Sequence, residues 1–136
     1  MIIVPFKADH LRALRLQPVQ VMASPSTPQD IEALGTAYTA LSGGEPVACG
    51  GLHELWPGRA LAWTYLGVDC GAEFLALHRQ VLLHVKQSPW RRVEAYVEDG
   101  HRNGHRWMKA LGFELEGILR AFMADGRDMA LYARVR

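Results

Sequence analysis

The sequence has few of the features that mark specialised classes of protein. Its two cysteines, Cys49 and Cys70, show no metal-ligand spacing, so we expect reduced thiols rather than a disulfide framework. The formal net charge is only +1, which argues against nucleic acid or an anionic membrane as a partner. No stretch approaches the roughly 20 apolar residues of a membrane span, and the start at Met1 lacks the basic segment of a signal peptide. We therefore expect a cytoplasmic protein.

The composition is that of an ordinary folded domain. The chain has 136 residues, of which 49% are hydrophobic and 21% are charged. This length is enough to bury one core but too short for two independent cores. The balance of apolar and charged residues is far from that of a disordered chain. We therefore expect a single domain over residues 1–136.

Hydrophobic periodicity and turn residues divide the first half of the chain into strands and two short helices. One helix begins near Lys7 and ends before Pro18. A second begins at Ser26 or Thr27, has proline in its first turn, and ends near Gly35. Strands are expected at Ile2–Phe6, Thr36–Leu41, Val47–Leu55 and Ala60–Val68. The last of these is almost wholly apolar, which is typical of a strand in the middle of a sheet.

The second half is predicted to alternate between helices and strands. A helical period over Ala72–Gln87 is followed by an alternating strand at Arg92–Glu98. A helix at His101–Leu111 ends at Gly112. The last two predicted strands, joined by a turn that contains an Asp-Gly pair, are Phe113–Phe122 and Met129–Val135. The order β-α-α-β-β-β-α-β-α-β-β predicts an α/β fold with a central mixed sheet and helices on both faces.

Two short motifs near the C-terminus carry a family resemblance. A helix ends in Leu111-Gly112-Phe113, and the next strand contains Glu116-Gly117-Ile118-Leu119. Together with the element order, these residues resemble the last conserved block of the GNAT (GCN5-related N-acetyltransferase) superfamily. The segment from Gly126 is similar to the end of the ribosomal-protein N-acetyltransferase branch. The chain also resembles diverged GNAT-like proteins of tailed phages in its length, in the order of its helices and strands, and in the short loop after residue 66.

The GNAT resemblance implies an acetyltransferase that moves an acetyl group from acetyl-CoA, a cosubstrate, to an amine by direct attack, without a metal. Backbone groups at a helix start suit the coenzyme pyrophosphate, and a strand edge suits its pantetheine arm. The resemblance implies that the coenzyme-binding residues are Leu66, Gly67, Val68, Gly71, Ala72 and Gly104.

The chain departs from the family pattern at two places. The loop after Leu66 has no Arg or Gln at its head, and Asp69 and Glu73 bring negative charge toward the place where phosphates would lie. Met108 stands where many relatives have a tyrosine that acts as general acid, and a thioether cannot donate a proton. We therefore expect acetyl-CoA to bind weakly.

Three residues are candidates for the group that accepts a proton from the amine. Glu98 and His101 flank the turn between a strand and the last long helix, and Glu54 lies at the end of another strand. The structural alternative is that Glu98 and Glu54 are solvated strand carboxylates and His101 is only a helix-start residue. His101 and His105 have a spacing that metals use, but no third ligand follows, so no metal site is expected.

Two functions remain open at this stage. The first is an N-acetyltransferase whose acceptor is a small-molecule or peptide amine. The second is a catalytically inactive GNAT-like protein, of the kind that tailed phages encode, that serves in binding or virion assembly. A homodimer or a protein partner is compatible with either, and the short loop at residues 67–72 is the feature that separates them.

Overall fold

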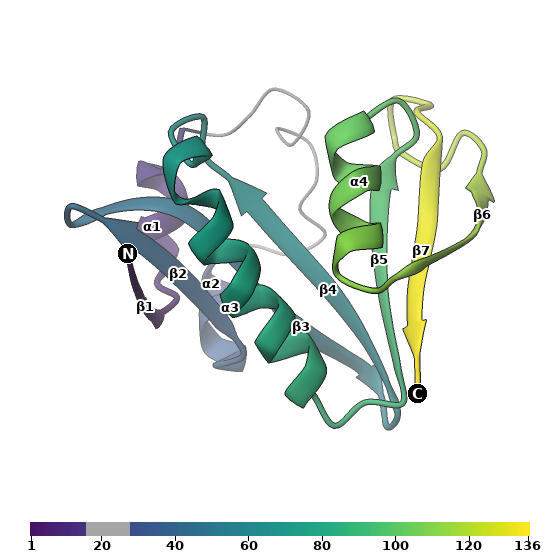
Figure 1. Ribbon diagram of the computed structural model, residues 1–136, viewed down its shortest axis with the longest axis horizontal. Coiled ribbons are helices and arrows are strands. Elements are labelled where there is room, and N and C mark those ends of the chain that lie inside the picture. Colours follow the sequence, from purple (N-terminus) through teal and green to yellow (C-terminus); the bar gives the residue numbers. More distant parts are fainter. Residues whose placement is uncertain (16–27) are drawn as a thin grey trace. The chain divides into compact units, whose positions relative to one another are not determined.

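The computed structural model describes residues 1–15 and 28–136, which form two compact units (Figure 1). Unit 1 comprises Met1–His53 and Trp63–Gln80, and unit 2 comprises Glu54–Ala62 and Val81–Arg136. The predicted end of the first helix before Pro18 and the predicted helix start at Ser26 or Thr27 lie outside the described residues. None of the described helices is long and apolar enough to cross a membrane.

The strands form a mixed sheet in the order β1-β2-β3-β4-β5-β7-β6. β4 and β5 run parallel, whereas β1 with β2, β2 with β3, β5 with β7 and β6 with β7 are antiparallel pairs. The strands are β1 Ile2–Pro5, β2 Ala37–Ser42, β3 Glu45–Trp56, β4 Arg59–Leu66, β5 Arg92–Glu98, β6 Glu114–Leu119 and β7 Met129–Val135. The helices are α1 Ala8–Ala13, α2 Pro28–Leu34, the 3₁₀ turn η2 Gly71–Glu73, α3 Phe74–Gln87 and α4 Arg102–Ala110. The predicted α/β class with a mixed sheet is confirmed.

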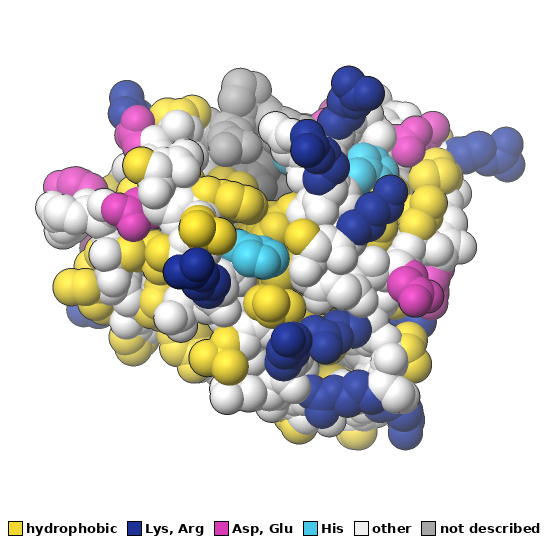
Figure 2. Space-filling view, viewed as in Figure 1, with side chains coloured by type: hydrophobic (Ala, Val, Ile, Leu, Met, Phe, Trp, Pro, Cys, Tyr) yellow, Lys and Arg dark blue, Asp and Glu magenta, His cyan; other side chains and the backbone are white. Residues whose placement is uncertain are grey.

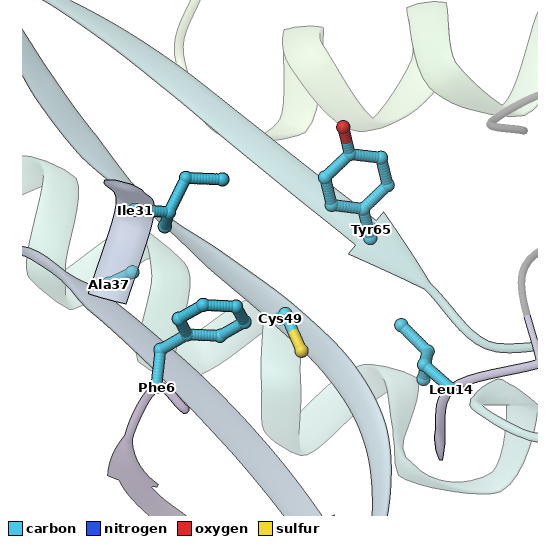
Figure 3. Close-up of a cluster of buried hydrophobic side chains, with 6 residues drawn as sticks. All are labelled: Phe6, Leu14, Ile31, Ala37, Cys49 and Tyr65. Carbon is cyan, nitrogen blue, oxygen red and sulfur yellow. The ribbon is translucent and has the colours of Figure 1, made fainter. Parts of the chain in front are cut away.

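The core of unit 1 is a cluster of apolar side chains from its strands and two short helices (Figure 3). Trp63 packs at its edge, with its ring 6.3 Å from that of Phe6 in a T-shaped arrangement. Such edge-to-face pairs add to the stabilisation from burial alone. The buried members are Phe6, Leu14, Ile31, Ala37, Cys49 and Tyr65.

The sheet of unit 2 has two chemically different faces. Val93, Ala95 and Val97 of β5 are buried and point to the side on which α4 packs. The other face carries Arg92, Glu94, Tyr96 and Glu98, since side chains alternate along a strand. This division follows the predicted alternation. Glu94 is nevertheless only 1% exposed, because two arginines cover it.

Several predicted boundaries differ from the structure by one to three residues, and three of them have a local structural cause. β4 ends at Leu66 rather than Val68. The N–H of Val68 donates to the Arg15 carbonyl at 2.7 Å and is therefore not available to a neighbouring strand. The next helix starts as a 3₁₀ turn, so α3 begins at Phe74. β6 ends at Leu119 rather than Phe122, because Ala121 has a φ of +50° and its N–H donates to the Asp128 carboxylate. This geometry turns the chain out of the ladder.

Candidate functional site

Glu98 and His101 are brought together by the tight turn between β5 and α4 in unit 2. The His101 N–H donates to the Glu98 carbonyl at 2.9 Å, which closes the turn at the end of the strand. The Glu98 side chain is 29% exposed, and its Oε2 lies 3.7 Å from Nη1 of Arg127. A carboxylate and an imidazole therefore lie at one strand end, where α/β folds commonly hold ligands. They project to different sides, because Glu98 alternates with Val97 along β5, whereas the His101 ring lies on the Val97 side.

His105 braces this turn from the second turn of α4. Its Nε2 lies 2.7 Å from the Asp99 carbonyl oxygen, and its Nδ1 lies 2.6 Å from the Tyr132 hydroxyl. Because a carbonyl only accepts, Nε2 carries the proton, and in the neutral ring Nδ1 accepts from the hydroxyl. Burial, with a smaller contribution from Asp99, raises the pKa of Tyr132, so this hydroxyl stays protonated.

The segment between β6 and β7 holds the other side of the turn. The Asp99 N–H donates to the Asp128 carbonyl at 3.1 Å, and the Asp128 carboxylate accepts from the Ala121 N–H at 2.7 Å. Arg127 Nε lies 2.8 Å from Asp125 Oδ2, which is an ion pair, although the alignment is too poor for a hydrogen bond. Sequence reasoning missed Arg127, Asp128 and Tyr132, and only the Asp-Gly turn marked this region.

Gly104 lies where α4 packs closely against β5. A Cβ at this position would lie 2.7 Å from Val97 Cγ1 and 2.7 Å from His101 Nδ1. The absent side chain therefore leaves the space in which the His101 ring rests against the helix. This residue was predicted to contact the coenzyme, and within unit 2 its position also sets that of His101.

Glu54 is not near the other two candidates. Its Oε1 accepts a hydrogen bond from Trp90 Nε1 at 3.1 Å, and Trp90 lies two residues before β5 begins. Glu98 is the last residue of β5, about 20 Å further along the strand at roughly 3.3 Å per residue. The structure therefore places Glu54 and Glu98 at opposite ends of β5.

The predicted coenzyme loop after β4 belongs to unit 1, and much of its backbone is already bonded. The N–H of Gly67 donates to the Val47 carbonyl at 2.8 Å and that of Val68 to the Arg15 carbonyl at 2.7 Å. The N–H groups of Cys70 and Glu73 close local turns at 3.2 and 2.9 Å. Leu66 is buried at the end of β4. A Cβ on Gly67 would come within 2.9 Å of Leu14 Cδ1, so the α1 segment packs tightly here.

Both acids of this loop have partners. Arg15 Nη2 forms an ion pair with Asp69, and Ser42 Oγ donates to Glu73 Oε1 at 2.9 Å. Among the bonds of the described residues, none uses the N–H of Gly71 or Ala72, and a Cβ on Gly71 would meet nothing within 4 Å. Two N–H groups at a helix start and a nearby guanidinium suit a phosphate, although they are fewer than a long glycine-rich loop offers. Sequence reasoning missed Arg15.

Neither cysteine is prepared for nucleophilic chemistry. Burial raises the pKa of the Cys49 thiol to about 11, against a weaker effect of the Thr39 hydroxyl. Burial, together with the charge of Glu73, also raises the pKa of Cys70, which is 2% exposed. Among residues 1–15 and 28–136, no three His, Cys, Asp or Glu side chains are grouped so that they would hold a metal ion.

Positive charge is unevenly distributed over the surface. In the view of Figure 2, lysine and arginine side chains gather around the C-terminal end of the chain. Arg136 lies there, with its Nη2 2.6 Å from the Lys86 carbonyl and its N–H 2.9 Å from the Arg91 carbonyl. The net charge of +1 therefore conceals a local basic surface in unit 2.

No protein-family model and no curated protein sequence matches the chain. Solved structures do match it. It is similar to a ribosomal-protein-alanine N-acetyltransferase from Brucella melitensis, with a TM-score of 0.75 at 15% identity, covering 100% of both chains. An N-acetyltransferase from Staphylococcus aureus matches with a TM-score of 0.73 at 14% identity over 98% of this chain and 97% of the other.

A GNAT-family acetyltransferase from Bacillus anthracis matches with a TM-score of 0.67 at 16% identity, covering 98% of this chain and 93% of the other. At these identities the similarity concerns the fold, and it extends over nearly the whole chain. The chain therefore has the fold of the GNAT-type N-acetyltransferases.

Proposed function

We propose that this protein is an acyl-CoA-dependent N-acetyltransferase that transfers an acetyl group to an amine by direct attack. The proposal is supported most directly by the position of Glu98 and His101 at the end of β5 in a chain with this fold. A carboxylate and an imidazole at one strand end are suited to taking a proton from an ammonium group near neutral pH.

The residues of the β5–α4 turn handle the proton of the acceptor. Glu98 or His101 removes it, directly or through water, so that the nitrogen attacks as a neutral amine. When bound, acetyl-CoA supplies the acetyl group as a thioester, whose C–S bond breaks as the C–N bond forms. Met108 cannot donate a proton to the leaving sulfur, so we infer that solvent does. Glu54 is the weaker candidate, since it lies at the other end of β5.

The coenzyme is proposed to bind in unit 1 along Leu66, Gly67 and Val68 and at the N–H groups of Gly71 and Ala72; the predicted contact at Gly104 stays a prediction for unit 2. Arg15 supplies the cation that the loop itself lacks, once its guanidinium exchanges Asp69 for a phosphate. Because few N–H groups are available, we expect affinity in the range of tens of micromolar or weaker.

A turnover assay tests this function. Release of the coenzyme thiol is measured with a panel of amines, peptides and protein N-termini, for wild type and for Glu98→Gln and His101→Ala. Loss of the general base lowers the rate by roughly a hundredfold. The melting temperatures and the coenzyme affinity of both variants should stay near those of wild type, because neither side chain is buried. If wild type releases the coenzyme thiol no faster than buffer does with every acceptor of the panel, the proposed acetyltransferase activity is refuted.

A second candidate is a GNAT-like protein that binds or assembles without catalysis, as in diverged phage proteins. It is favoured by the occupied N–H groups of Gly67 and Val68 and by Met108 in place of the family's tyrosine. A protein of this kind would bind no acetyl-CoA at all. We expect either form to work in the reducing cytoplasm, alone, as a homodimer or with a protein partner.

A further inference from the structure

A hollow of about 510 Å³ lies on the face of unit 2 that carries Glu94 and Tyr96. This is the face of β5 opposite to the Val97 side, on which α4 packs. The volume is within the range of ordinary ligand sites. Its walls combine arginines with aromatic and aliphatic side chains: Trp56, Gly58, Arg59, Arg91, Arg92, Glu94, Tyr96, Leu119 and Leu131.

Glu94 fixes the orientation of two arginines in this hollow. Its side chain is 2% exposed; Arg59 donates to it through Nε and, at 2.8 Å, through Nη2, and Arg92 donates through Nε at 2.8 Å. The remaining Arg92 nitrogens bind Glu116, with Nη1 at 3.0 Å. A buried ionic network of this kind adds little stability compared with apolar packing. Its clearest consequence is that the orientation of both guanidinium groups is fixed.

The hollow has one positive charge more than its acids compensate. Arg91 has no acidic partner among residues 1–15 and 28–136, and its Nη2 lies where a Cβ on Gly58 would come within 2.9 Å. The N–H of Arg136 donates to the Arg91 carbonyl at 2.9 Å, and the Arg136 guanidinium binds the Lys86 carbonyl. This charge favours an anionic ligand and repels polycationic acceptors such as polyamines.

The hollow points along β5 toward the proposed proton acceptor. Arg92, Glu94, Tyr96 and Glu98 share one face of the strand, and the hollow extends from Arg92 to Tyr96. Glu98 is the next side chain on that face, about 20 Å from Arg92. The Phe122 ring lies 5.2 Å from that of Tyr96 and provides an aromatic surface beside this path. An extended peptide covers such a distance in about six residues, at roughly 3.3–3.6 Å each.

We propose that the acceptor is a peptide whose amino group reaches Glu98 and whose acidic side chains, about four to six residues further on, bind at Arg91 and Arg59. The apolar parts of the peptide lie against Trp56, Leu119 and Leu131. This proposal rests on the proposed N-acetyltransferase function, because that function assigns the amine to Glu98.

Peptide binding without coenzyme tests the hollow separately from catalysis. Fluorescence anisotropy is measured with a hexapeptide that has alanines at positions one to three and glutamates at four to six, labelled at its C-terminus. The comparison peptides carry glutamine at four to six, or the glutamates at one to three. We expect the first peptide to bind about tenfold more tightly than the glutamine peptide, as for a charge-assisted hydrogen bond. Arg91→Ala should abolish this preference, and Lys109→Ala, which removes an exposed charge from α4, should preserve it.

Each result bears on one proposal. Equal binding of the glutamate and glutamine peptides, or a preference that survives Arg91→Ala, would overturn the acidic anchor. Tighter binding of a single-stranded oligonucleotide than of the acidic peptide would overturn it too. Binding that depends on the glutamates and on Arg91, without acetylation of the peptide at saturating acetyl-CoA, would support the acidic anchor and refute the proposed acetyltransferase. If the glutamate and glutamine peptides are acetylated equally well, the acetyltransferase is supported and the acidic anchor is refuted.

Discussion

Replacing Gly104 by alanine tests the geometry that positions His101. The new Cβ would lie 2.7 Å from both Val97 Cγ1 and His101 Nδ1, about 0.7 Å closer than ordinary van der Waals contact. Val97 is buried and branched at Cβ, so it yields little, and the His101 ring must swing away. Overpacking costs about 1–3 kcal/mol, and the helix propensity of alanine returns about 1 kcal/mol. We expect a net loss of about 1 kcal/mol in the free energy of unfolding.

Urea unfolding measures this loss, and the NMR shifts of the His101 ring report its displacement. Gly100→Ala is the matched control, because a Cβ there meets nothing within 4 Å and the residue lies in the same turn. The control should unfold like wild type and leave the His101 signals in place. If Gly104→Ala is as stable as wild type with an unmoved His101 ring, the described packing of α4 against β5 is wrong.

Three further predictions concern groups whose partners are known. Tyr132→Phe removes the hydroxyl that donates to His105 and should lower the free energy of unfolding by about 1 kcal/mol in urea; no loss would show that this hydrogen bond is absent. Asp69→Asn frees Arg15 and should tighten acetyl-CoA binding about twofold to fivefold, as measured by calorimetry. Weaker binding would show that the Asp69 carboxylate favours coenzyme binding and would contradict this reasoning. Cys49, with its pKa near 11, should react with thiol reagents about tenfold faster per pH unit between pH 7 and 10 without levelling off, and a plateau near pH 8 would contradict its burial.

Local patterns predicted the elements well where side-chain periodicity and chain punctuation agree. β5 occupies the predicted residues Arg92–Glu98, because its alternation is clean and a proline lies shortly before it. β6 was predicted too long, because no turn residue between Leu119 and Phe122 marks its end, which depends on the Asp128 carboxylate that accepts the Ala121 N–H. A side-chain hydrogen bond of this kind ends an element without a glycine or proline to mark the end.

The candidate site was predicted only in part, for a similar reason. Glu98 and His101 are three residues apart, so their place at the same strand end follows from one turn. The Arg15–Asp69 ion pair joins positions 54 residues apart, and sequence spacing contains no information about it. The alternation of β5 places Glu94 on the face opposite to Val93 and Val97. Its burial depends on Arg59, which comes from another strand.

Calorimetric titration of the wild-type protein with acetyl-CoA tests the central claim most directly. The account predicts saturable binding at one site, with a dissociation constant of about tens of micromolar or weaker, and a further loss of affinity in Arg15→Ala. Coenzyme A without the acetyl group should bind similarly, because the proposed contacts involve the phosphates and the pantetheine arm. Absence of binding at millimolar acetyl-CoA would contradict the proposed acetyltransferase and leave the non-catalytic binding protein as the explanation of this fold.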